Sequence, residues 1–75
     1  MKTYTNAEVA EAKAWLKGWQ SGPKARSPYK KWTTHNAWMR GRAARELDDA
    51  GNAGPGVVWA LAAYSRRAGV DWGLG

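Results

Sequence analysis

Apolar side chains recur at helical spacing near the start of the chain and predict a helix over residues 6–20. They fill a single stripe about 120° wide, which consists of Val9, Ala12, Trp15, Leu16 and Trp19. Thr5 and Glu8 have the spacing of a capping box, in which the Thr5 hydroxyl accepts from the Glu8 amide and the Glu8 carboxylate reaches back. Gly22 and Pro23 then end the helix.

Residues 21–28 interrupt this pattern and predict a link, because two prolines and a glycine disfavour regular structure there. Ser27 followed by Pro28 has the form of an N-cap and a first helical residue. We therefore expect one helical turn over residues 28–32.

A second long helix is predicted over residues 35–50, with Thr34 as its cap and Gly51 as its stop. The β-branched pair Thr33-Thr34 separates it from the preceding turn. One side of this helix is an apolar arc made of Met39, Ala43, Ala44, Leu47 and Ala50. Trp38 lies on the other side among cations, so it is either a wedge against the first helix or a platform for a ligand.

A third helix is predicted over residues 57–68, with Pro55 near its start and Gly69 as its stop. Its first half is apolar nearly all round, so it is either buried or covers another apolar surface. Beyond it, Trp72 and Leu74 either fold back onto the helices or stay exposed.

These elements predict one all-α domain, in which two helices joined by the link carry a third, because no alternating run indicates a strand. The two long helices share a pattern: Ala14-Trp15-Leu16-Lys17-Gly18 is echoed by Ala37-Trp38-Met39-Arg40-Gly41. A glycine three residues after a tryptophan lies on nearly the same helix face and lets a neighbouring backbone come close. We expect Gly18 and Gly41 to mark the crossing of two antiparallel helices.

Bulk composition limits the possible functions. A chain of 75 residues buries only about 60–65% of its unfolded surface, which leaves little room for a deep enzyme pocket. The chain has no cysteine, which excludes disulfides and thiolate metal sites and fits a reducing cytoplasm. No apolar run is long enough to cross a bilayer. A pI near 10.1 favours polyanionic partners.

The net charge of +6 is concentrated between Glu11 and Glu46, which enclose nine cations and no acid. These cations are Lys13, Lys17, Lys24, Arg26, Lys30, Lys31, Arg40, Arg42 and Arg45. A purely structural surface would relieve the repulsion among them with mixed signs, so the run favours binding of a polyanion.

Five of the aromatic side chains interleave with these cations: Trp15, Trp19, Tyr29, Trp32 and Trp38. We expect Trp15, Trp19 and Trp59 to build the core. Trp32 and Trp38 sit beside cations, so they either join the core or stack on unpaired RNA bases.

No residue set predicts catalysis or metal binding. His35 is the one histidine, and its place near a helix start suits a surface residue or a cap. Glu46, Asp48 and Asp49 fan around one helical turn and do not converge. The run Gly51-Asn52-Ala53-Gly54-Pro55-Gly56 follows no strand, which argues against a nucleotide loop. We expect a non-enzymatic protein without catalytic residues, metal or cofactor.

An ordered set of motifs resembles the ribosome modulation factor family of small basic bacterial and phage proteins: Gly18-Trp19-Gln20-Ser21-Gly22, Pro28-Tyr29 and Trp38-Met39-Arg40-Gly41. The resemblance covers residues 14–47 and leaves residues 51–75 as a C-terminal extension. It implies binding to the small ribosomal subunit and lowered translation through inactive ribosome dimers. The motif positions carried over are Gly18, Gly22, Pro28, Tyr29, Trp38 and Gly41. Arg42 stands where the best-known member has another aromatic, and the link is shorter here.

Charge, aromatic placement and resemblance together predict a nucleic-acid-binding face and a ribosomal RNA or ribosome partner, with no membrane partner. Its candidate residues are Lys17, Lys24, Arg26, Tyr29, Lys30, Lys31, Trp32, Trp38, Arg42 and Arg45. The alternative is a phage or mobile-element inhibitor that binds a host protein or nucleoprotein complex through the same face. Both alternatives allow a homodimer.

Overall fold

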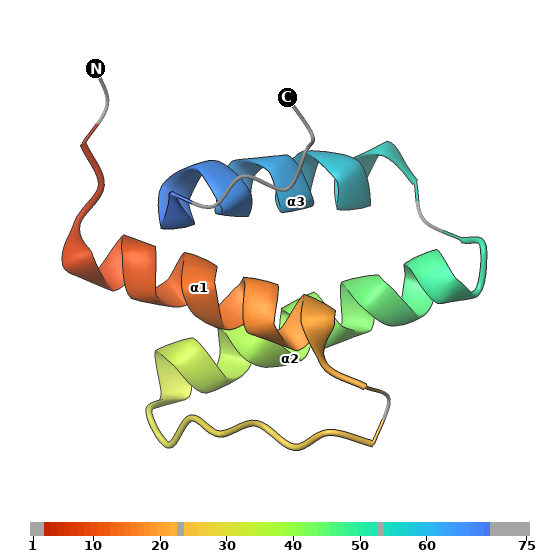
Figure 1. Ribbon diagram of the computed structural model, residues 1–75, viewed down its shortest axis with the longest axis horizontal. Coiled ribbons are helices and arrows are strands. Elements are labelled where there is room, and N and C mark those ends of the chain that lie inside the picture. Colours follow the sequence, from red (N-terminus) through yellow and green to blue (C-terminus); the bar gives the residue numbers. More distant parts are fainter. Residues whose placement is uncertain (1–2, 23, 53, 70–75) are drawn as a thin grey trace.

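The computed structural model describes residues 3–22, 24–52 and 54–69, and these form three helices and no strand. They are α1 (Asn6–Gln20), α2 (Trp32–Asp49) and α3 (Pro55–Ala68). Helix α1 lies in the middle, with α2 packed on one side and α3 on the other (Figure 1). The predicted all-α class is confirmed.

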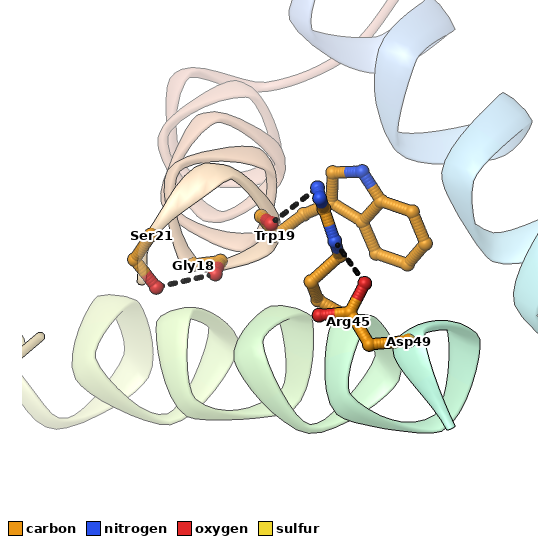
Figure 2. Close-up of polar contacts among 5 residues, drawn as sticks. All are labelled: Gly18, Trp19, Ser21, Arg45 and Asp49. Atoms are coloured by element: carbon orange, nitrogen blue, oxygen red, sulfur yellow. Dashed lines mark hydrogen bonds and ion pairs between the residues drawn. The ribbon is translucent and has the colours of Figure 1, made fainter. Parts of the chain in front are cut away.

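Helix α1 has the predicted bounds because both of its ends are closed by local hydrogen bonds. The amide of Glu8 donates to the Thr5 hydroxyl at 3.1 Å, and the Thr5 amide donates to the Glu8 carboxylate at 3.3 Å. At the other end the Ser21 hydroxyl donates to the Gly18 carbonyl at 2.6 Å (Figure 2). The capping box is therefore confirmed, whereas Pro23 lies outside the described residues.

Helix α2 begins at Trp32, three residues before the predicted start, and ends at Asp49. The predicted turn over residues 28–32 is absent, and Thr33-Thr34 continues the helix. The Thr34 hydroxyl donates to the Lys31 carbonyl at 3.2 Å, so it bonds back into its own turn and caps no later helix. The β-branched pair was overridden because the helix gains its stability from packing farther along.

Helix α3 begins at Pro55, two residues before the predicted start, with proline in the first turn. It ends at Ala68 as predicted, where Gly69 takes a left-handed conformation with φ of 71°. That conformation favours glycine and closes the helix. Trp72 and Leu74, whose packing was left open, lie outside the described part of the chain.

The two glycines of the repeated pattern mark the contact between α1 and α2. A Cβ atom added to Gly18 would overlap the carbonyl oxygen of Trp38 and lie 2.8 Å from its carbonyl carbon. A Cβ atom added to Gly41 would overlap the carbonyl oxygen of Trp15 and lie 2.8 Å from its carbonyl carbon. Each glycine therefore sits against the tryptophan that precedes the other glycine, and the predicted close crossing is confirmed.

The predicted antiparallel direction of this pair is wrong. Helices α1 and α2 run the same way, both from left to right in Figure 1, and the described residues 24–31 of the connection between them (residues 21–31) return beneath α2. An extended link of this length spans up to about 35 Å, whereas α1, with 15 residues, is about 22 Å long. The link is thus long enough to bring the chain back before α2 starts.

Three tryptophans form the centre of the core, and α3 completes it. Trp15, Trp19 and Trp38 are at most 8% exposed. The Trp15 ring stacks on Trp19 at 5.8 Å between centroids and on Tyr64 of α3 at 4.8 Å. The inner side of α3 packs against this cluster through Val57, Ala60, Leu61, Tyr64 and Ala68. The sequence left open whether α3 is itself buried or covers another apolar surface, and the structure shows that it covers one.

Two apolar faces are only partly covered. In the arc of α2, Met39 and Leu47 are 42% and 47% exposed while Ala44 packs against the core, because the glycine crossing turns Trp38 toward α1. Trp59, predicted as core, is 77% exposed, and its neighbour Val58 is 56% exposed. The molecule is only 17 Å thick along its shortest axis, less than two helix diameters, so α3 has a partner on one side alone.

Candidate nucleic-acid interface

We call the segment between α1 and α2 the basic link (residues 21–31). Over its described residues 24–30, exposed and partly buried side chains alternate. Ala25, Ser27 and Tyr29 are partly buried, and both Ala25 and Tyr29 pack against the core. The residues between and beside them are exposed, namely Lys24, Arg26, Pro28 and Lys30. An extended chain points successive side chains to opposite sides. Arg26 and Lys30 therefore point outward from the extended part, and Lys24 precedes them in the turn closed by the hydrogen bond from the Ala25 amide to the Gly22 carbonyl. The three cations form an outward row, and Tyr29 packs against the core behind it.

The sequence analysis missed this alternation because the two prolines and the glycine of the link were taken to disfavour any regular backbone structure. The order Lys-Ala-Arg-Ser-Pro-Tyr-Lys over residues 24–30 already carries the signal, since polar and small or aromatic residues alternate along it. Proline suits an extended segment that needs no amide donor at that position. The amide of Tyr29 donates to the Ser27 hydroxyl at 3.2 Å, which fixes the local course of the chain.

The row of cations leads directly to an exposed tryptophan. Lys31 has an extended backbone, is exposed, and is the residue before α2. Trp32, the first residue of α2, is 73% exposed, and its ring centroid lies 6.3 Å from that of the partly buried His35. The early start of α2 thus places this ring at the junction of the link and the helix, next to Lys30 and Lys31.

Trp38 does not belong to this surface. It is 2% exposed and lies in the core, so of the two predicted roles the wedge is the one that the structure shows. A ring buried to this extent has no face open for a nucleic-acid base.

Arg45 is held at the α1–α2 junction by three contacts, as Figure 2 shows for two of them. Its Nε donates to Asp49 Oδ1 at 3.0 Å, and its Nη1 donates to the Trp19 carbonyl at 3.5 Å. Its guanidinium lies 5.6 Å from the centroid of the Trp19 ring. A cation at the carbonyl end of α1 stabilises the helix dipole. Arg45 therefore joins the two helices, and its charge is partly neutralised.

Arg42 has a similar place one turn earlier. Its Nε lies 3.8 Å from Glu46 Oε1, and its guanidinium lies 6.0 Å from the Trp38 ring centroid. Its side chain is 26% exposed. The i,i+4 spacing of Arg42 to Glu46 and of Arg45 to Asp49 was the sequence signal for both pairs.

The structure therefore divides the predicted site residues into three groups. The first lies along the basic link and at the start of α2: Lys24, Arg26, Lys30, Lys31 and Trp32, with Tyr29 behind them. The second, at the helix junction, consists of Trp38, Arg42 and Arg45. Lys17 stands apart, exposed in the last turn of α1.

Acidic residues are kept away from the first group. The described acids lie in the first half of α1 and in the last turns of α2, and the basic link contains none. The first turn of α2 also has no acid, and its N-cap Lys31 provides no side-chain hydrogen bond. The partial positive charge of a helix start therefore adds to the field of the neighbouring lysines.

Among the described residues no three His, Cys, Asp or Glu side chains gather as a metal site would require. None of the described helices is long and apolar enough to span a membrane. No protein-family model, curated protein or solved structure matches the chain.

Proposed function

We propose that the protein is a non-enzymatic RNA-binding protein that acts on the ribosome and modulates translation. The observation that carries this proposal is the outward row of Lys24, Arg26 and Lys30, which ends at the exposed Trp32. Cations spaced along an extended backbone neutralise phosphates. An exposed aromatic ring among them can stack on a nucleic-acid base, a role that a purely solvated surface does not require.

The resemblance to the ribosome modulation factor family supports the choice of the ribosome as the place of action. Its motif residues have structural parts here: Gly18 and Gly41 form the crossing, Trp38 fills the core, and Tyr29 anchors the basic link. The shared pattern therefore specifies a scaffold that displays a basic link, and the cations on that link are the candidates for RNA contact.

The test compares two variants of equal net charge. The link variant carries Lys24→Gln, Arg26→Gln and Lys30→Gln, and the control variant carries Lys13→Gln, Arg40→Gln and Arg66→Gln. All six side chains are exposed, and each triple change lowers the net charge from +6 to +3, since three cations are removed. A difference between the variants therefore reports position rather than total charge.

On sucrose gradients at low salt, the wild type and the control variant should co-sediment with ribosomes or their small subunits. The link variant should stay near the top of the gradient, because the row that contacts phosphate is gone. If the wild type binds neither ribosomes nor free RNA but is retained by one defined host protein, the inhibitor alternative replaces this proposal.

A further inference from the structure

Among the tryptophans of the described chain, Trp32 differs from the three core residues in exposure and from Trp59 in its neighbours. Trp15, Trp19 and Trp38 are in the core, whereas Trp32 and Trp59 are 73% and 77% exposed. Burying a large aromatic side chain stabilises a protein by several kcal/mol, so leaving one in water gives up that gain. Trp32 directly follows two lysines, whereas the cation nearest to Trp59 in the sequence is Arg66.

The surroundings of Trp32 leave its ring accessible. Its aromatic neighbour is His35, one turn along α2, with the two ring planes tilted by 35°. Lys30, Lys31 and Thr33 beside it are also exposed, and the 73% exposure of Trp32 leaves most of its side chain open to solvent. The fold thus presents a flat aromatic surface at the end of the cation row.

The length of the row fits a strand of nucleic acid. Lys24 lies in a turn that the Ala25 amide closes by donating to the Gly22 carbonyl at 3.0 Å. Beyond the turn, an extended chain advances about 3.3 Å per residue, so Arg26 and Lys30 are separated by about 13 Å. A sugar–phosphate backbone that follows the link would pass Lys24, Arg26 and Lys30 in turn and bring its next base to Trp32. A base can stack on a protein ring only when it is unpaired, because in a duplex its faces are occupied by neighbouring base pairs.

We infer that the basic link binds an unpaired RNA segment, with one base stacked on Trp32. This inference rests on the proposed function and specifies its ligand: a single strand rather than a duplex. The cations attract the phosphates of a single strand and of a duplex alike, whereas stacking on Trp32 favours the single strand.

The experiment measures the affinity of a short fluorescein-labelled oligoribonucleotide, alone or annealed to its complement, by fluorescence anisotropy. Trp32→Ala should weaken single-strand binding by about 5- to 150-fold, the range that follows from losing one base–aromatic stack. Its duplex affinity should stay within about twofold of the wild type, since phosphate contacts are unchanged. Trp32→Tyr should restore part of the lost affinity, because tyrosine keeps a stacking face.

Trp59→Ala is the matched control, because it removes a similarly exposed tryptophan from α3, where the nearest cation in the sequence is seven residues away. It should leave both affinities unchanged. If Trp32→Ala has no effect, weakens strand and duplex equally, or matches Trp59→Ala, the inference is wrong although the protein still binds RNA. If the wild type binds neither form at low salt, the proposed function fails as well.

Discussion

Replacing Gly41 with leucine should destabilise the protein by about 1–3 kcal/mol, although leucine is the better helix former. The new side chain would meet the backbone of Trp15 and lie against the amide of Trp19, and neither can rotate away. Helices α1 and α2 must therefore separate, which opens the core around Trp38. Thermal unfolding followed by circular dichroism should show the midpoint falling by about 4–8 °C per kcal/mol.

Gly56→Leu is the control for this change, because Gly56 also lies in a helix but has nothing within 4 Å of an added Cβ. It should leave the midpoint unchanged or raise it, because the better helix propensity of leucine adds up to about 1 kcal/mol to the free energy of unfolding. Gly18→Leu should resemble Gly41→Leu, and the double variant should lose less than the sum, since one insertion already separates the helices. An unchanged or raised midpoint for Gly41→Leu would rule out the close crossing.

Trp38→Ala should remove a large part of the stability of the fold. Truncating a buried tryptophan destabilises by about 3–5 kcal/mol, whereas a chain of 75 residues has a total of only about 4–11 kcal/mol. The variant should show a reduced helical signal at room temperature and a shallow, low-temperature transition. Circular dichroism and urea unfolding on the same sample measure both.

Trp32→Ala provides the comparison, since its ring is exposed and its loss should change stability by no more than about 0.5 kcal/mol. The two tryptophans lie six residues apart on α2, yet one belongs to the core and the other to the proposed RNA surface. A Trp38→Ala variant that melts at the wild-type temperature would show that the ring contributes nothing to the core.

Local signals in the sequence were sufficient where short-range physics decides the structure. The capping box at Thr5 and Glu8 determines where α1 starts, and the left-handed conformation at Gly69 determines where α3 ends. The glycine crossing was also predictable, because a repeated Trp-x-x-Gly pattern has few other uses on two helices. In each case a short sequence pattern indicates the outcome.

Features that depend on distant contacts were not predictable in the same way. The parallel direction of α1 and α2 depends on how the link returns, which periodicity does not report. Trp59 reads as core because its helix is apolar all round, but a three-helix molecule this flat buries only one side of α3. Met39 and Leu47 are exposed whereas Trp38 is buried, because the position of Gly41 determines which side of α2 can approach α1.

The candidate site was predicted in composition but not in arrangement. Charge counting identified the cations of the basic link together with Arg42 and Arg45, whereas the structure separates the outward row from two arginines paired with Glu46 and Asp49. Counting treats all cations alike, and only the i,i+4 acids distinguish the paired ones. We therefore expect the arginine pair to matter more for stability, and the link more for binding.

The central claim, that the basic link contacts RNA phosphates, is tested most directly by the salt dependence of binding to a single-stranded oligoribonucleotide. Each phosphate neutralised on a single strand contributes about 0.7 to the slope of log affinity against log salt. The link variant should therefore show a slope shallower than the wild type by about 2 for its three lost cations, while the control variant keeps the wild-type slope. Wild-type binding that ignores salt, or a link variant with the wild-type slope, would contradict the claim.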